Sequence, residues 1–569
     1  MKHVLTAVLV LFVFTDQTEL LAQGGRGGRQ PQGRGGGRFG GAGDTDEQPA
    51  GTAVIRGRIV TADTGTPVRR AQVRAAMANN RDTRLVTTDE QGNFEFRDLA
   101  GGRWNVTASK AGFVTMRFGQ RRSFEAGRPI EVADAQVMER VNFALPRGAA
   151  INGRLLDEFG DPMARARVQA LRYQLVQGTR RLTPIGVTAQ TDDTGAFRLW
   201  GLMPGEYYVS ALLRALPVDE PRDAISYAPT YYPGTGSVTE AQPVSLDIGG
   251  EASVSFALMP VRAVRVSGRV LMSTGYPLSG GIVTLGADDP TGAAPVAFGV
   301  NGRVAQDGTF TIPNVAPGSY RLTALSGNPR NASADSERGS TPISVAGEDL
   351  TGITVITSRG AVLTGTVGAE WGSSAQPPVG GLRVTAQPVP FERGMAARPA
   401  RVDADGTFTL TNLFGPSLIT VSGLSQEWIV EAIVVAGSDV TDTPYDFQPN
   451  EAIERAEIVL TDQITQVSGT VLDGDGMPAA DYTVVVFPED ATKWAPPSRY
   501  VKSARPDQQG LIKIVGLPPD DRYLAVAVDY LEEGGAADPE FLDLIKNRAT
   551  RFSLEEGASA TVDLTLVEW

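Results

Sequence analysis

Apolar and polar residues alternate with a period of two in many short stretches of the chain, most regularly after a recurring glycine. Each such glycine is followed by apolar residues at the second, fourth and seventh positions. The five copies are Gly92, Phe94, Phe96, Leu99; Gly195, Phe197, Leu199, Leu202; Gly308, Phe310, Ile312, Val315; Gly406, Phe408, Leu410, Leu413; and Gly510, Ile512, Ile514, Leu517. Period-two alternation after a turn residue is typical of a strand with one buried face. Because one register returns five times, the sequence predicts five β units.

Other strands recur around this pattern at similar spacing. An opening strand carries a glycine before apolar residues, at Gly57, Gly153, Gly268, Gly365 and Gly469. A later strand begins at Trp104, Tyr207, Tyr320, Leu418 or Tyr523, and a closing strand covers 141–145, 254–258, 353–356, 458–460 or 562–566. Copies of about a hundred residues, rich in short strands and turns, are typical of small two-sheet sandwiches.

The predicted fold class is therefore all-β, a tandem array of five small β-sandwich domains of Ig-like or transthyretin-like type. The predicted sandwiches cover residues 53–147, 148–260, 261–359, 360–461 and 462–569. One short helix is expected in the last. Asp538 can cap it, Pro539 suits the first turn, and the apolar residues Phe541, Leu542, Leu544 and Ile545 follow.

The first residues have a different pattern. Residues 1–22 resemble a secretory signal peptide, with Lys2 and His3, an apolar run from Val4 to Phe14 and a small-residue end at Ala22. Residues 23–52 form a Gly/Arg-rich segment that we interpret as a disordered linker. No apolar stretch has the roughly 20 residues that a membrane helix needs. We expect an exported protein that is periplasmic, outer-membrane-associated or extracellular, with no membrane span.

The turn and core motifs together resemble a known family, the carboxypeptidase regulatory-like domain. The third copy shows them best, in Asp307-Gly308-Thr309-Phe310 and Pro317-Gly318-Ser319-Tyr320. The resemblance implies a transthyretin-like sandwich, grouped with carbohydrate-binding-like folds. Copies four and five depart from the pattern, since Gly415-Pro416 reverses a turn and Gln509 replaces an acidic residue. Such motifs specify a fold and leave function open.

The composition excludes most catalytic chemistry. The only histidine is His3, inside the segment expected to be removed, and the chain has no cysteine. Zinc sites need imidazole or thiolate ligands, and Ser or Cys nucleophiles are most often activated by His. We therefore predict a non-enzyme without a cofactor. The formal charge of -13, with basic residues concentrated only in the N-terminal linker, makes nucleic acid an unexpected partner.

Carboxylates are the remaining chemical candidates. Paired acidic residues, as in glycoside hydrolases, occur at Asp192-Asp193, Asp288-Asp289, Asp403 with Asp405, and Asp520-Asp521. Calcium ligands are suggested weakly by Asp403 and Asp405 and by Asp473 and Asp475, because oxygen ligands at alternate positions suit that ion. Most of these residues stand beside a turn glycine or proline, where Asp bonds to nearby backbone. We interpret them as turn residues, with no metal site.

Aromatic residues are the best binding candidates. The second copy carries a tyrosine-rich insertion with Tyr227, Tyr231 and Tyr232, and flat rings of this kind stack on sugar faces. Trp494 is a weaker candidate in the fifth copy. The alternative is that the tyrosine rings cover the open edge of their own sandwich.

These observations lead to a hypothesis about function. We expect a non-enzymatic protein of the bacterial envelope that binds carbohydrate or a protein partner, such as an envelope protein, through sandwich loops. A purely structural spacer is the alternative, and a carboxylate-based glycoside hydrolase is a further one. A lectin should expose the tyrosines in one plane, and a hydrolase should place two carboxylates about 5 to 10 Å apart across a cleft.

Overall fold

A computed structural model describes most of the chain after the N-terminal segment. The described residues are 51–77, 82–176, 178–213, 225–262, 264–288, 300–327, 335–369, 377, 379–389, 397–425, 427–479, 481–507 and 510–568. The predicted signal peptide and nearly all of the predicted linker lie outside these residues.

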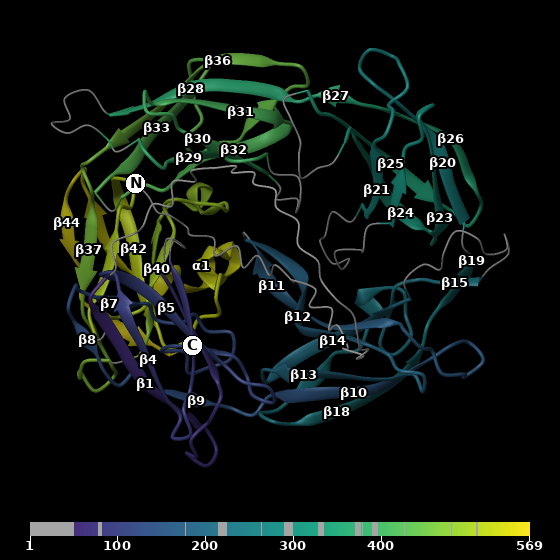
Figure 1. Cartoon of the computed structure of the whole chain (residues 1–569). Coiled ribbons are helices and arrows are strands. Elements are labelled where there is room, and N and C mark those ends of the chain that lie inside the picture. Colours follow the sequence, from purple (N-terminus) through teal and green to yellow (C-terminus); the bar gives the residue numbers. More distant parts are fainter. Residues whose placement is uncertain are drawn as a thin grey trace, which may run out of the picture.

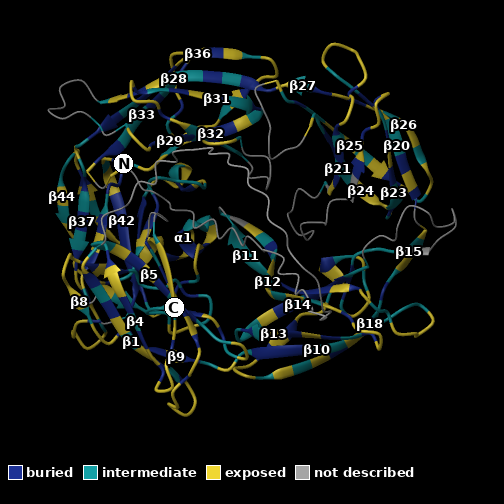
Figure 2. Ribbon diagram, viewed as in Figure 1, coloured by how far each residue is buried: buried dark blue, intermediate teal, exposed yellow. Residues whose placement is uncertain are grey.

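The sheets fall into five groups that follow one another along the chain and around a ring (Figure 1). The last group lies beside the first. We propose that each group is one module with the boundaries predicted above, and we number the modules from the N-terminus. Buried residues concentrate inside each module, while exposed residues follow the turns and outer strands (Figure 2).

The first and second modules each contain two main sheets. In the first, these are β4 (Asn93–Leu99), β1 (Ala53–Thr61), β8 (Val137–Met138) and β9 (Phe143–Leu145), and β3 (Thr83–Thr87), β2 (Gln72–Met77), β5 (Gly102–Ser109), β6 (Met116–Arg117) and β7 (Ile130–Val132). In the second, they are β13 (Ala196–Leu202), β10 (Ala149–Leu156) and β18 (Glu251–Ala257), and β12 (Thr179–Gln190), β11 (Arg167–Val176), β14 (Gly205–Leu212), β16 (Thr230–Tyr231) and β17 (Val244–Leu246). A further pair, β15 (Ile225–Tyr227) and β19 (Pro260–Arg262), lies at the end of the second module.

The third and fourth modules repeat the plan. The third has β23 (Thr309–Val315), β20 (Val264–Leu271) and β26 (Leu350–Ile356), and β22 (Val300–Arg303), β21 (Ile282–Ala287), β24 (Gly318–Leu325), β25 (Glu337–Val345) and β27 (Ser358–Arg359). The fourth has β31 (Thr407–Leu413), β28 (Ala361–Ala369), β36 (Ala452–Thr461), β33 (Ile429–Val435) and β34 (Ser438–Asp439), and β30 (Ala400–Arg401), β29 (Arg383–Pro388), β32 (Gly415–Ser422) and β35 (Tyr445–Phe447).

The fifth module adds short helices to its sheets. The strands are β41 (Ile512–Val515), β37 (Gln466–Gly469) and β44 (Ser559–Thr561), and β38 (Val471–Leu472), β45 (Leu564–Val567), β42 (Asp520–Val528), β39 (Thr483–Pro488), β40 (Lys502–Ala504) and β43 (Thr550–Leu554). The helices are η3 (Ala491–Trp494), η4 (Gly535–Ala537), α1 (Pro539–Ile545) and η5 (Lys546–Arg548), and the second module has η1 (Val238–Glu240).

One pairing rule recurs in all five modules. The opening strand runs antiparallel to the strand of the glycine-led repeat and parallel to the closing strand, as in β20 with β23 and β26. All fifteen apolar positions of the repeat are buried, from Phe94 in the first module to Leu517 in the last. The all-β prediction and the predicted register are confirmed.

Two kinds of glycine explain why the register is kept. The glycine that leads each repeat has a positive φ, such as 81° at Gly308, which disfavours any residue with a Cβ. The glycine of the opening strand has a different role. A Cβ added to Gly268 would lie 2.0 Å from the carbonyl oxygen of Ile353 on the parallel closing strand. The equivalent approach recurs at Gly57 and Gly469, so the parallel pairing requires glycine there.

The predicted helix is confirmed as α1. The Asp538 side chain accepts a hydrogen bond of 3.0 Å from the Glu540 backbone N–H, which caps the first turn. Phe541, Leu542 and Ile545 are buried against the fifth module, whereas Leu544 is exposed, because it lies on the opposite side of this short helix. Within the described residues, no helix combines the length and apolar character that crossing a bilayer requires.

Candidate functional site

The tyrosine-rich insertion is largely folded inward. Tyr231 is 3% exposed and packs with Leu171, Leu182 and Val238 in a small satellite core. The reason is that β16 pairs with β14, with Tyr231 opposite Ser210, which fixes the segment on the edge of its own sheet. The expectation of an exposed tyrosine rim is therefore wrong at Tyr231.

The other two tyrosines are partly buried. The Tyr227 hydroxyl donates a hydrogen bond of 2.6 Å to Oε2 of Glu158. Burial, assisted by this carboxylate, raises the pKa of the Tyr227 phenol. The Tyr232 ring meets Phe256 edge to face, with 6.0 Å between centroids. The insertion thus covers the edge of its sandwich, as the alternative interpretation predicted.

Trp494 is not available at the surface either. It is 3% exposed at the end of η3, and its Nε1–H donates a 2.8 Å hydrogen bond to the carbonyl oxygen of Pro488. Its ring meets Phe487 edge to face at 5.7 Å between centroids. The placement of Trp494 as an exposed ligand-binding ring is corrected, because the short helix turns it into the core.

The acidic residues considered for calcium hold turns together. Oδ1 of Asp405 accepts hydrogen bonds from the Thr407 hydroxyl and backbone N–H, at 2.7 and 3.0 Å, and these bonds lower the Asp405 pKa. Oδ1 of Asp473 accepts from the backbone N–H groups of Asp475 and Met477, at 3.0 and 2.9 Å. Asp403 closes the same turn as Asp405 through its backbone. No group of three potential metal ligands occurs among the described residues.

The paired carboxylates have similar local partners. Asp192 accepts hydrogen bonds from the backbone of Thr194 and Ala196, both at 2.9 Å. Asp288 pairs with Arg321 at 3.0 Å, and Asp520 pairs with Lys493. Asp289 lies outside the described residues.

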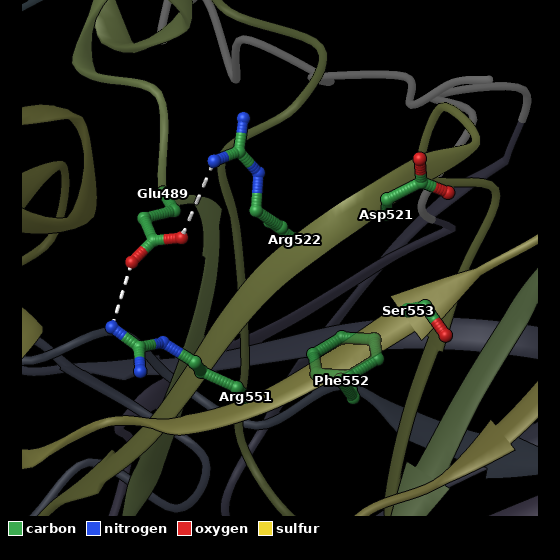
Figure 3. A pocket seen from close by; sticks show the side chains of 6 residues that line it. All are labelled: Glu489, Asp521, Arg522, Arg551, Phe552 and Ser553. Atoms are coloured by element: carbon green, nitrogen blue, oxygen red, sulfur yellow. Dashed lines mark hydrogen bonds and ion pairs between the residues drawn. The ribbon is translucent and has the colours of Figure 1, made fainter.

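A shallow recess on the fifth module combines an aromatic ring with charged side chains. It is lined by Glu489, Asp521, Arg522, Arg551, Phe552 and Ser553 (Figure 3). Glu489 lies between the two arginines and accepts a 2.7 Å hydrogen bond from Arg551. One face of the Phe552 ring stacks on Tyr523, at 5.5 Å between centroids and 21° between planes. An aromatic ring beside hydrogen-bonding groups can hold a small polar molecule.

The most elaborate polar site lies where the first, second and fifth modules meet. We call it the closure junction: residues 117–128 of the first module, Arg172 of the second, and Asp481, Arg505 and residues 529–533 of the fifth. The loop 118–129 connects β6 to β7, Asp529 directly follows β42, and Arg505 directly follows β40. Loops and strand ends of the first and fifth modules therefore supply most of the contacts, and Arg172 comes from the middle of β11.

Arg505 and Glu125 are the two most buried charges of the junction. The Arg505 side chain is 4% exposed, and that of its partner Glu125 is 3% exposed. The Arg505 guanidinium donates to the carbonyl oxygens of Gly119 and Ala126 at 3.0 and 2.6 Å, and it also pairs with Asp481. These bonds use both terminal nitrogens of the guanidinium, while its buried Nε has no hydrogen-bond partner among the described residues. Such bonds offset much of the cost of burying the charge.

Around Arg505, arginines of the first and second modules contact acids of the fifth. Asp481 also pairs with Arg121 and Arg128, at 3.2 and 2.9 Å, and burial together with the nearby Arg505 charge lowers the Arg128 pKa. Two pairs nearer to solvent join Arg117 to Glu533 at 2.6 Å and Arg122 to Asp529 at 2.8 Å.

Arg172 binds Glu532 with two hydrogen bonds of 3.0 and 2.6 Å. Its guanidinium also lies 3.8 Å from the centroid of the Phe124 ring, close enough for a cation–π contact.

Backbone contacts extend the junction. The Glu533 N–H donates to the Phe124 carbonyl oxygen at 2.9 Å, and Glu125 forms an antiparallel β-bridge with Glu532. The Tyr530 hydroxyl donates to the Ser123 carbonyl oxygen at 2.8 Å, and burial raises the Tyr530 pKa to about 12. Phe124 has a φ of 60°, a strained value for a bulky residue, so docking contacts must stabilise this loop.

Sequence reasoning did not find this junction. The signals were present as four arginines in residues 117–128 and three acids in residues 529–533. No local pattern indicates, however, that segments about 400 positions apart meet.

The described residues form a tandem array of β-sandwiches. Residues 54–146 match the family model of the carboxypeptidase regulatory-like domain, which confirms the resemblance for the first module. No curated protein matches the chain.

Solved structures with similar strands include the TIE protein of Bacillus anthracis, with 12% identity over 74% of this chain and 73% of that one and a TM-score of 0.17. A streptococcal ancillary pilin is 12% identical over 53% of this chain and 98% of its own, with a TM-score of 0.20. A putative carbohydrate binding protein of Pseudomonas aeruginosa is 11% identical over 17% and 89%, with a TM-score of 0.13.

Proposed function

We propose that this chain is a non-catalytic scaffold of the bacterial envelope or exterior, whose five modules close into a ring and present surfaces to a carbohydrate or protein partner. The observation that carries the scaffold proposal is the closure junction, where a buried arginine of the last module binds the first. Such a junction gives tandem modules a defined shape, whereas a simple spacer needs only end-to-end connections.

The non-catalytic part of the proposal rests on residue chemistry. The chain has one histidine, at position 3, and no cysteine. Among the acidic pairs considered for glycoside hydrolysis, Asp192 binds backbone N–H groups of its own turn, and Asp288 and Asp520 pair with cations. A hydrolase needs two carboxylates that face a shared cleft. The recess around Phe552 has two acids, but Glu489 is bound by Arg551, so this alternative has little support.

The scaffold proposal is tested by the shape of the chain in solution. Small-angle scattering of residues 51–569 should fit a closed ring, and an Arg505→Ala variant should give a larger radius of gyration. Arg522→Ala is the matched control, because Arg522 is also in the fifth module but its side chain is 72% exposed. An unchanged scattering curve for Arg505→Ala, with intact strand content by circular dichroism, would reject the closed ring.

A second candidate function, saccharide binding, is favoured by the recess around Phe552. Here a partly buried ring, two arginines, two acids and a hydroxyl surround one opening. We expect a glycan array to show binding by the wild type that Arg551→Ala reduces strongly. Tyr232→Ala should leave binding unchanged. Equal loss of glycan binding in both variants would indicate that the tyrosine insertion is part of the site. No binding by the wild type would overturn the proposal of a carbohydrate ligand.

A further inference from the structure

The two sides of the closure junction carry opposite charge and belong to opposite ends of the array. The first-module loop contributes Arg117, Arg121, Arg122 and Arg128, whereas the fifth module contributes Asp481, Asp529 and Glu533. The two faces differ, so each is complementary to the other and not to itself. Such a contact is heterologous, the kind that forms rings when it closes and longer assemblies when it does not.

We propose that the closure junction is also an intermolecular surface whose partner is a second copy of this chain, with the fifth module of one copy docked on the first module of the other. This inference rests on the closed ring proposed above. Two chains that exchange their junctions keep every contact that each chain makes alone, and neither face stays exposed.

The physical basis is that closure within one chain and pairing between two chains use the same bonds. The bonds from Arg505 to the first module, the Glu125–Glu532 bridge and the four arginine–acid pairs all join the first module to the fifth. The choice between closure and pairing depends on the effective concentration of one face near the other. In the closed chain the three intervening modules set this value, and in the pair the protein concentration sets it. Opening the ring at high protein concentration should therefore yield dimers.

Charge complementarity argues for a second copy over an unrelated partner. The Arg505 fork contacts two carbonyl oxygens and the Glu125 carboxylate of the first module, while a backbone bridge runs beside it. The strained Phe124 turn positions its carbonyl oxygen for the Glu533 N–H. An unrelated partner would have to reproduce a guanidinium, an acidic cluster and a strand edge together.

Complementary charge reversal separates the two states. One variant, Arg117→Glu with Arg122→Glu, places acidic side chains against Glu533 and Asp529. The other, Asp529→Arg with Glu533→Arg, places arginines against Arg122 and Arg117. Each variant alone should be open and monomeric, because neither its own faces nor a second identical copy can pair. An equimolar mixture should form a dimer, with one native and one reversed junction. A chain carrying all four substitutions should close again as a monomer.

The measurement is molar mass by size-exclusion chromatography with light scattering, together with small-angle scattering of each variant alone. A doubled mass in the mixture, lost in about 1 M salt, supports the inference. Open variants that stay monomeric when mixed overturn it while leaving the closed ring intact. Variants that retain the wild-type scattering curve even when Arg505→Ala is added overturn the closed ring and the inference with it.

A wild-type experiment covers the case in which a charge reversal fails to fold. Two tagged forms of residues 51–569 are mixed in about 1 M salt, concentrated, and returned to about 0.05 M salt. Capture of one tag should then retain the other, and capture without the high-salt step should not. Absence of co-capture after the high-salt step would overturn the inference.

Discussion

The fifth module is joined to the fourth and to the first module in different ways. On one side, Ile429 of the fourth module is 2% exposed and packs inside the core of the fifth, among residues such as Val467 and Leu517. On the other side, the first module is joined mainly through charges, with Arg505 at the centre. The fourth-module contact combines this buried apolar side chain with a 2.6 Å ion pair between Arg499 and Asp442, whereas the first-module contact is mainly ionic.

The difference follows from how the partners reach one another. The fourth and fifth modules are consecutive, so an apolar side chain can be buried between them without ever being exposed on a separate body. The first and fifth modules meet only after the whole array has folded. Their surfaces must remain soluble until then, and charged faces meet this need while selecting the correct partner.

The strongest way to break the ionic side is to remove Arg505. Arg505→Ala leaves the buried Glu125 carboxylate without its guanidinium, while Asp481 keeps Arg121 and Arg128. Loss of one partner of a buried ion pair costs about 3–5 kcal/mol. We expect the ring to open, as a larger radius of gyration, while the modules stay folded. Opening by the control Arg522→Ala as well would contradict a specific role for Arg505.

The second largest effect is expected from a substitution at the apolar contact with the fourth module. Ile429→Ala removes buried methyl groups and should lower the free energy of unfolding of the fifth module by about 3 kcal/mol. Calorimetry would show a lower melting temperature in low and high salt alike. Ile356→Ala, at a 67% exposed isoleucine, is the control and should have little effect. If the loss of melting temperature in Ile429→Ala depended on salt concentration, the result would contradict the distinction between the two contacts.

Salt alone should distinguish the two joints. The pairs Arg117–Glu533 and Arg122–Asp529 are partly exposed, and exposed pairs contribute about 0.2–1 kcal/mol each. Raising the salt to about 1 M shortens the screening length to about 3 Å and should populate an open form. Because the chain lacks cysteine, dyes on single introduced cysteines in the first and fifth modules can report the distance by energy transfer. A distance independent of salt would show that the buried contacts suffice.

The smallest effect is expected from pH at Tyr530. Its pKa is raised by burial to about 12, so the neutral phenol is favoured in the closed ring. The contribution of Tyr530 to ring closure should be complete below about pH 10, the pKa of an ordinary tyrosine. It should be lost as the pH rises towards about 12. Tyr530→Phe should weaken closure by about 1 kcal/mol and remove this component of the pH dependence. Identical pH profiles for the two proteins would exclude Tyr530 as its source.

Much of the fold could be predicted because its determinants are local. The Gly308 repeat and its equivalents combine a turn that needs a positive φ with a strand that buries every second residue. Both requirements act over a few residues, so the sequence displays them directly. The helix cap at Asp538 is local for the same reason.

The candidate sites could not be predicted in the same way. Tyr231 and Trp494 stand in polar, proline-containing segments that resemble exposed loops, yet β16 pairing and the η3 turn bury both rings. Whether an aromatic residue in such a segment faces solvent depends on the sheet edge beside it. That edge is formed by strands elsewhere in the chain.

Sequence alone determined the all-β class, the repeated register and the absence of most catalytic groups, because each depends on residue identity or short-range spacing. Only the tertiary structure decided that the tyrosine insertion closes an edge and that the ends of the array meet. The Arg505 contacts join residues 379 and 386 positions apart. Contacts at such separation depend on how successive modules are angled, and each module contributes to that geometry without any periodic trace in the sequence.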